Sequence, residues 1–253
     1  ATNPAGSVTS PGFTQFVSPE GGWQWRNPLP TGNGLTRAFF VNGRFLVGGI
    51  RGTLLTSTDG LNWTTRTLPA ANNLFSFHFF NGLYVALGSL GAVFTSPDTL
   101  TWTPRNSGTV HRDAGSGLQD LALGDGRLVA VGIAGLTSTS TDGIHWTSGT
   151  AGTTEDLTGV AFAFDRFHAV SSLSGRIFST ADGVNWTSLT TPTAGMRRIA
   201  YGAGRLVAGG ASGETLTSTN GTTWTGGSAA TAEFLLGINF INGQFVAVGT
   251  GGA

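Results

Sequence analysis

The sequence predicts an all-β fold built from a repeated unit of four short strands, on three observations. A polar turn that ends in tryptophan recurs along the chain, as in Ser57–Trp63, Ser140–Trp146 and Ser179–Trp186. The tryptophans of five successive copies, at positions 63, 102, 146, 186 and 224, are 39, 44, 40 and 38 residues apart. Short apolar runs between these turns are bounded by Gly, Asn and Asp, as β-strands are. A period near forty residues with four short strands is typical of one β-propeller blade.

Each copy has the same order of parts, which the first complete copy illustrates. Its four strands are expected at 35–41, 44–49, 53–57 and 62–66. Asn42-Gly43 joins the first two as a two-residue hairpin, and Ile50-Arg51-Gly52 links the second to the third. Asp59-Gly60 turns the chain into the fourth strand. Copies of the second strand follow at 83–87, 127–131, 166–170, 205–209 and 244–248.

The last copy stops after two strands, and the missing two are expected at the other end of the chain. Residues 13–17 and 23–26 have the composition of a third and a fourth strand. Pairing the first strands with the last closes the ring and removes open sheet edges. The prediction is a single six-bladed β-propeller domain over residues 1–253, with four-stranded antiparallel blades. Blade 6 combines 235–253 with 12–30, two strands plus two.

Composition excludes several kinds of partner. Charged residues are 10% of the chain and the formal net charge is zero, which argues against nucleic acid because phosphate neutralisation needs a basic surface. No apolar run approaches the roughly 18 residues that cross a bilayer, so membrane insertion is not expected. The chain has no Cys, which excludes thiolate metal sites, and no His pair has metal-binding spacing. We expect no metal and no cofactor.

The expected location follows from the composition of the surface rather than from the start of the chain. Residues 1–6 lack the charged and apolar regions of a signal peptide, and a secreted protein would look the same after cleavage. The polar surface rich in Ser, Thr and Gly favours an extracellular or periplasmic protein, which we expect to be a monomer.

The repeated turn, Ser57-Thr58-Asp59-Gly60-Leu61-Asn62-Trp63 and its copies, resembles the Asp-box, or BNR repeat, of sialidases and related propellers. The resemblance covers nearly the whole chain and implies a propeller in which this turn is structural, away from the usual ligand face. Asp accepts backbone N–H bonds, Gly takes the positive φ, and Trp packs between blades. Classical sialidase activity is not expected. Sialidases use a Tyr–Glu pair as nucleophile, and Tyr84 and Tyr201 fall within strands here.

Charged residues that do not repeat should gather on one face. The first–second and third–fourth turns of every blade lie on one side of the disc, here called the turn face. The second–third links and the inter-blade connections lie on the other side, here called the connection face. Six carboxylates map to the connection face or the channel: Asp113, Asp120, Glu155, Asp156, Glu214 and Glu233. None recurs in most blades, so the fold is not expected to require them.

The mouth of the central channel is the expected site. Aligning the innermost strands puts Arg37, Asp120 and Arg198 in one layer with Ser76, Gly159 and Gly237. Charges that converge in a confined site favour ligand binding. The alternative is an Arg–Asp–Arg cluster that only plugs the channel. The longest connection, 106–117, adds His111, Arg112 and Asp113 on the same face, where extra loop length often carries binding.

The first functional hypothesis is a ligand-binding propeller with one asymmetric site, because the site residues do not repeat in each blade. Its ligand would be a glycan, a polysaccharide or another small hydroxyl-rich or anionic molecule. The expected ligand-binding residues are Arg37, Arg198, Arg197, Arg112, Glu155, Asp156 and Arg51.

Two alternatives stay open. A glycoside hydrolase or lyase would need two carboxylates, about 5–5.5 Å apart for retention or 6.5–9.5 Å for inversion. Its expected catalytic residues are Asp120, Glu233, Asp113 and His111, with Glu155 or Asp156 as other partners of Asp120. A protein-interaction or adhesion scaffold would need exposed aromatic side chains on the connection face, whose loops are mostly Gly, Ser, Thr and Ala.

Overall fold

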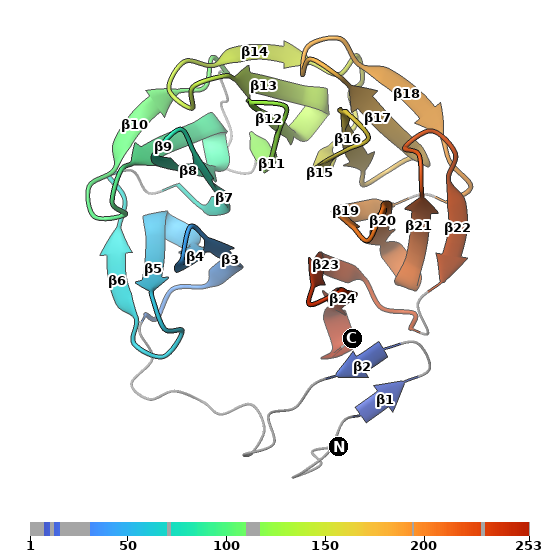
Figure 1. Cartoon of the computed structure of the whole chain (residues 1–253), viewed down its shortest axis with the longest axis horizontal. Helices are drawn as coiled ribbons and strands as arrows, with labels where there is room; N and C mark the ends of the chain where they lie inside the picture. Colours follow the sequence, from blue (N-terminus) through green and yellow to red (C-terminus); the bar gives the residue numbers. More distant parts are fainter. Residues whose placement is uncertain are drawn as a thin grey trace.

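The computed structural model describes residues 8–10, 13–15, 31–69, 72–109, 117–193, 195–228 and 231–252. In these residues, five antiparallel four-stranded sheets and a two-stranded sixth stand around one axis, each with its first strand innermost (Figure 1). The predicted all-β, six-bladed propeller is therefore confirmed. Within the same residues, no helix has the length and apolar character needed to span a membrane.

The blades follow the predicted strand order. Blade 1 contains β3 (Leu35–Val41), β4 (Arg44–Gly49), β5 (Thr53–Ser57) and β6 (Thr64–Thr67). Blade 2 contains β7 (Leu74–Phe80), β8 (Leu83–Gly88), β9 (Ala92–Ser96) and β10 (Thr103–Asn106). Blade 3 contains β11 (Leu118–Gly124), β12 (Arg127–Gly132), β13 (Leu136–Ser140) and β14 (Thr147–Thr150).

Blade 4 contains β15 (Leu157–Ala163), β16 (Arg166–Ser171), β17 (Arg176–Thr180) and β18 (Thr187–Thr190). Blade 5 contains β19 (Met196–Gly202), β20 (Arg205–Gly210), β21 (Glu214–Ser218) and β22 (Thr225–Ser228). Blade 6 contributes β23 (Leu235–Ile241) and β24 (Gln244–Gly249). Short 3-10 turns follow the second strand in five blades: η1 (Ile50–Gly52), η2 (Ser89–Gly91), η3 (Ile133–Gly135), η4 (Ala211–Gly213) and η5 (Thr250–Gly252).

The closure of blade 6 differs from the expectation as far as the structure describes it. β1 (Val8–Ser10) pairs with β2 (Phe13–Gln15), and β24 pairs with β23. No pairing of β2 with β24 occurs in the described part of the chain. Residues 16–30, which include the expected fourth strand, lie outside it. Completion of blade 6 by residues 12–30, and the single domain over 1–253, stay predictions.

The repeated turn joins the third and fourth strands, as the sequence indicates. In blade 1, Asp59 Oδ1 accepts the N–H groups of Leu61 and Asn62, both at 2.8 Å. The indole N–H of Trp63 donates to the carbonyl oxygen of Gly60 at 3.1 Å. Hydrogen bonds from Asn62 and Leu61 hold the pKa of Asp59 below its usual range. The turn is thus a structural element whose aspartate stays ionised.

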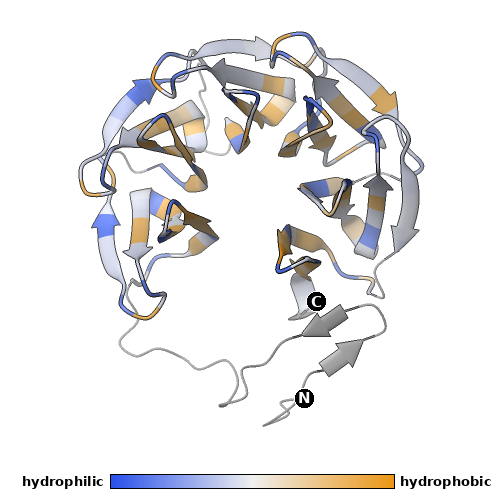
Figure 2. Cartoon of the chain, in the orientation of Figure 1, coloured by the Kyte–Doolittle hydropathy of each residue, from blue (hydrophilic) through white to orange (hydrophobic). Residues whose placement is uncertain are grey.

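Apolar side chains pack between neighbouring blades. Figure 2 shows hydrophobic residues concentrated in the inner strands of the ring. The outermost strands are mainly exposed, and β14 and β22 are exposed along their whole length. Five of the six first strands begin with a fully buried residue: Leu74, Leu118, Leu157, Met196 and Leu235. The core is therefore a series of layers between blades, with the connection face left to polar loops.

Candidate functional site

A β-bulge at the same place in all six first strands aligns the residues around the channel. The pairing register shifts between Leu35 and Arg37 in β3, and between the equivalent residues of β7, β11, β15, β19 and β23. A bulge re-aims the side chain that follows it. The residues after the bulges form what we call the channel layer: Arg37, Ser76, Asp120, Gly159, Arg198 and Gly237. The alignment made from sequence is reproduced residue by residue.

Arg37 and Asp120 form an ion pair that joins blade 1 to blade 3. Arg37 Nη1 lies 2.7 Å from Asp120 Oδ1, and Arg37 Nη2 donates to the carbonyl oxygen of Gln119 at 3.3 Å. Asp120 Oδ2 accepts the backbone N–H of Val160 in blade 4 at 3.1 Å. The two side chains are only 19% and 12% exposed. Both carboxylate oxygens of Asp120 are therefore already engaged.

Arg198 is the unusual member of the channel layer. Its Nη1 donates to two backbone carbonyl oxygens, those of Thr158 and of Arg197, the latter at 2.6 Å. In the residues that the structure describes, no carboxylate forms an ion pair with it. Burial, followed by repulsion from Arg37 and Arg197, lowers its pKa to about 10, although Asp120 partly offsets this. Arg198 therefore stays charged at neutral pH, beside two other cations and one carboxylate that is already paired.

Arg197, the bulge residue beside Arg198, contacts an aromatic ring on the connection face. Its guanidinium carbon lies 5.5 Å from the ring centroid of Phe234, in the connection that leads to blade 6. Phe234 and Leu236 are both exposed. Arg197 was expected at the site, but its aromatic neighbour was not. The signal was available, because Phe234 immediately precedes the first strand of blade 6.

Three carboxylates that were expected at the site instead make contacts within the fold. The expectation that the fold does not require them is therefore wrong. Glu155 Oε2 accepts the hydroxyl groups of Ser171 and Ser174, the latter at 2.5 Å, and Glu233 Oε2 accepts that of Thr250 at 2.5 Å. Burial raises the pKa of Glu155, but the serine hydrogen bonds outweigh it and the pKa is lowered. Asp156 Oδ1 accepts the backbone N–H of Ala134 at 3.0 Å.

The position of Glu155 and Glu233 is held by asparagine in two other blades. For this reason no repeated carboxylate was seen in the sequence. Asn72 and Asn33, like Glu155 and Glu233, lie two residues before a first strand. Asn72 Nδ2 donates to the carbonyl oxygen of Ser89 at 2.8 Å, and Asn33 Nδ2 to Thr53 Oγ1 at 2.7 Å. In these four blades the side chain fastens the connection to the second–third link or to the strand end beside it. A search for polar residues rather than acids at this position would have found the pattern.

The remaining predicted residues divide into two groups. Arg51 lies in η1 with φ of 55°, its side chain exposed and outside the channel layer. His111, Arg112 and Asp113 lie outside the described residues. Where the structure does describe the chain, no three His, Asp or Glu side chains are grouped as a metal site would need. No hydrogen bond joins Asp120 to Glu155, Asp156 or Glu233 in the described residues.

Comparison with known proteins supports the propeller fold. No protein-family model and no curated protein sequence matches the chain. An inactive virginiamycin B lyase from Staphylococcus aureus with quinupristin is similar at a TM-score of 0.77 and 15% identity, over 91% of this chain and 83% of that one. YCF48 bound to D1 peptide matches at a TM-score of 0.62 and 22% identity, over 86% and 75%. The Pan2 WD40 domain of Neurospora crassa matches at a TM-score of 0.66 and 11% identity, over 85% of this chain and 72% of that one. At these identities the likeness shows the propeller scaffold alone.

Proposed function

We propose that the chain is a ligand-binding propeller, extracellular or periplasmic, whose single asymmetric site at the channel mouth binds an anionic ligand. The observation that carries the proposal is Arg198, a partly buried guanidinium whose hydrogen-bond partners in the described residues are backbone carbonyl oxygens. A buried cation without a counter-charge is costly, and a carboxylate that reached it would relieve that cost. Arg37 and Arg197 add positive potential at the same place, and the carboxylate of Asp120 is already bonded.

An acidic glycan is the ligand class that we favour. The polar, net neutral surface suits a hydroxyl-rich molecule, and a carboxylate on the sugar would meet the arginines of the channel layer. The repeated turns support an Asp-box propeller as the scaffold, since their aspartate, glycine and tryptophan make the contacts that such a turn requires.

A second candidate function is the binding of a protein segment. Phe234 is exposed beside Arg197, and Leu236, two residues further along the chain, is exposed too. Aromatic and Arg side chains are enriched among the residues that dominate protein interfaces. A glycoside hydrolase has less support. The carboxylate expected to act, Asp120, has both oxygens in hydrogen bonds, and its expected partners bond to loops.

The test is isothermal titration with an oligogalacturonate and, separately, with a neutral oligosaccharide of the same length. Only the acidic oligomer should bind, and Arg198→Gln should weaken its binding by about tenfold or more, the loss of one charge-assisted contact. Arg127→Gln, on the turn face of blade 3, is the matched control and should bind as the unmodified protein does. Equal binding of both oligomers, or full binding by Arg198→Gln, would show the proposal to be wrong.

A further inference from the structure

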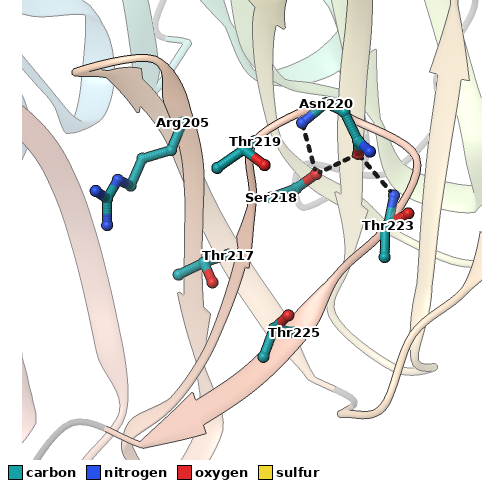
Figure 3. Close-up of a pocket in the computed structure, with 7 residues that line it drawn as sticks. All are labelled: Arg205, Thr217, Ser218, Thr219, Asn220, Thr223 and Thr225. Carbon is teal, nitrogen blue, oxygen red and sulfur yellow. Dashed lines mark hydrogen bonds between the residues drawn. The ribbon is translucent and has the colours of Figure 1, made fainter.

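A polar pocket lies on the turn face of blade 5, away from the channel. Its volume is about 270 Å³. It lies at the end of β21, the start of β22 and the repeated turn between them, with Arg205 from the start of β20 beside it (Figure 3). The lining residues are Arg205, Thr217, Ser218, Thr219, Asn220, Thr223 and Thr225. The lining therefore contains hydroxyl groups, one amide and one guanidinium, but no carboxylate and no aromatic ring.

The repeated turn of blade 5 lacks the negative charge that the other described turns carry. Asp59, Asp98, Asp142 and Asp182 occupy the position held here by Asn220. Asn220 Oδ1 accepts the N–H groups of Thr222 and Thr223, both at 2.9 Å. Because the oxygen must face these donors, the Nδ2 group takes the place of the outer carboxylate oxygen. A hydrogen-bond donor thus replaces an acceptor at the rim of the pocket.

No side chain of the outer strand β22 forms a hydrogen bond with the hydroxyl group of Thr217 in the described residues. In blade 2, Arg105 of β10 reaches back to the equivalent hydroxyl group and donates to Thr95 Oγ1 at 2.8 Å. In blade 5 the residue that matches Arg105 is Gly227, which has no side chain. The hydroxyl groups equivalent to Thr217 in blades 3 and 4 are also bonded, at Thr139 and Ser179.

Among the described residues, Arg205 does not make the hydrogen bonds that its counterpart in the neighbouring blade makes. Arg166 in blade 4 uses its guanidinium to bond Ser179, at 3.3 Å to the side chain and 3.4 Å to the carbonyl oxygen. Arg205 is exposed and takes part in neither of the two ion pairs found in the described residues. Figure 3 shows no hydrogen bond from its guanidinium to the hydroxyl groups of the pocket. One cation and several hydroxyl and amide donors are therefore available together.

We propose that this pocket binds a tetrahedral oxyanion, the sulfate or phosphate group of a ligand. Guanidinium, hydroxyl and amide groups supply the donors that such an anion needs, and charge-assisted bonds are the stronger kind. A neutral sugar fits less well, because sugar hydroxyl groups also need acceptors such as carboxylates, and no ring offers a stacking surface. The other described turns have a carboxylate at the position of Asn220, whereas the lining of this pocket has none. The pocket should therefore prefer an anion.

The experiment is a 1H–15N NMR titration of the whole chain with sodium sulfate and, separately, with sodium phosphate. Sodium chloride at matched ionic strength and glucose serve as reference titrations. The backbone signals of Thr219, Asn220 and Thr223 should shift saturably with an oxyanion, and the stronger of the two arms identifies the natural group. Chloride and glucose should leave these signals in place.

Two variants test the assignment, and each has a control. Asn220→Asp restores the residue of the other turns, so it should fold normally and weaken anion binding by about tenfold or more. Arg205→Gln should weaken binding to a similar extent, whereas Arg127→Gln, the equivalent change in blade 3, should not. Arg198→Gln should also leave it intact, which separates this pocket from the channel mouth. Shifts caused equally by chloride, saturable shifts with glucose, or full binding by Asn220→Asp would overturn the proposal.

Discussion

The two arginines of the channel layer differ in what their guanidinium groups contact. Arg37 bonds a carboxylate, whereas within the described part of the chain Arg198 bonds only the backbone carbonyls of Thr158 and Arg197. Removing one partner of a buried ion pair leaves an uncompensated charge, but removing an unpaired cation beside like charges relieves repulsion. The two positions should therefore respond to mutation in opposite directions.

Asp120→Asn should destabilise the protein by about 2 kcal/mol, below the full cost of breaking a buried pair because the side chains are partly exposed. It leaves Arg37 facing Arg198 without a counter-charge. Arg198→Gln should keep or raise the free energy of unfolding. Urea denaturation at neutral pH, followed by circular dichroism, measures both. A larger loss in Arg198→Gln than in Asp120→Asn would favour the plug interpretation over a binding site.

His168 should make stability depend on pH. It packs between blades 4 and 5, where the equivalent residues of blades 2 and 3 are Val85 and Val129. Burial lowers its pKa to about 4, with a smaller effect of Arg166 in the same direction and an opposing hydrogen bond to Ala163. The unfolded state therefore binds the proton more tightly. The contribution of His168 is complete above its ordinary pKa near 6.5 and is lost as pH falls towards 4.

His168→Val should flatten this dependence, because valine matches the equivalent positions and cannot be protonated. Between neutral pH and pH about 4, the unmodified chain should lose on the order of 2 kcal/mol more stability than the variant. Thermal unfolding across the pH range measures the difference. His78 is partly buried, which lowers its pKa, and it stays in both proteins, so part of the dependence remains. Identical pH profiles would contradict the assignment to His168.

At the scale of strands and turns, repetition made the fold predictable. The bulge recurs in every first strand, so aligning the repeats placed Arg37, Asp120 and Arg198 in one layer. The start of the fourth strand was less accurate. It was expected at residue 62, whereas β6 begins at Thr64, because the Asn62 side chain bonds Asp59 and the Trp63 indole bonds Gly60.

The contacts of long side chains could not be predicted in the same way. An alignment gives equivalent positions but not the direction in which a guanidinium extends. Arg37 reaches past blade 2, whose channel-layer residue is the small Ser76, to bond Asp120 in blade 3. Likewise, the bonds of Glu155 and Glu233 to nearby hydroxyl groups depend on loop geometry that the sequence pattern does not specify.

Contacts between blades require a small residue wherever the next blade presents a large ring. A Cβ atom added to Gly124 would lie 2.0 Å from the ring of Phe162 in blade 4. Gly124→Ala should therefore destabilise the protein by about 1–3 kcal/mol through overpacking. Gly149→Ala is the control, since its nearest neighbour, Thr137 Oγ1, would be 3.2 Å away. Urea denaturation compares the two, and equal stability would show that the Phe162 ring can move aside.

At the scale of the whole ring, the first and last blades expose residues that are buried elsewhere. Leu35 is 50% exposed, although its equivalents in the other five blades are fully buried. Val248 is 57% exposed, although the equivalent Leu87, Val131 and Val170 are buried. Figure 1 places β3 and the β23–β24 pair on either side of the interruption in the ring. Among the described residues, these two apolar surfaces have no neighbouring blade packed against them.

The repeat itself indicates which residues would meet if the ring closed. A Cβ atom at Gly48 in blade 1 would contact Leu74 in blade 2, and one at Gly209 in blade 5 would contact Leu235 in blade 6. Val248 is the equivalent position in blade 6 and Leu35 the equivalent of Leu74, so closure would bring these two together. Full burial of such a side chain contributes about 1.5–3 kcal/mol, which favours closure in solution.

The absence of native cysteine allows closure to be measured directly. Leu35→Cys with Val248→Cys should form a disulfide under mild oxidation, because closure brings the two Cα atoms within the reach of about 7 Å that the bond requires. Non-reducing electrophoresis and intact mass detect the cross-link, which should also raise the melting temperature. Leu35→Cys with Leu173→Cys, an exposed position in blade 4, is the control and should stay reduced. If the first pair also stays reduced, the ring is open in solution and the exposed surfaces of β3 and β24 are free to contact another molecule.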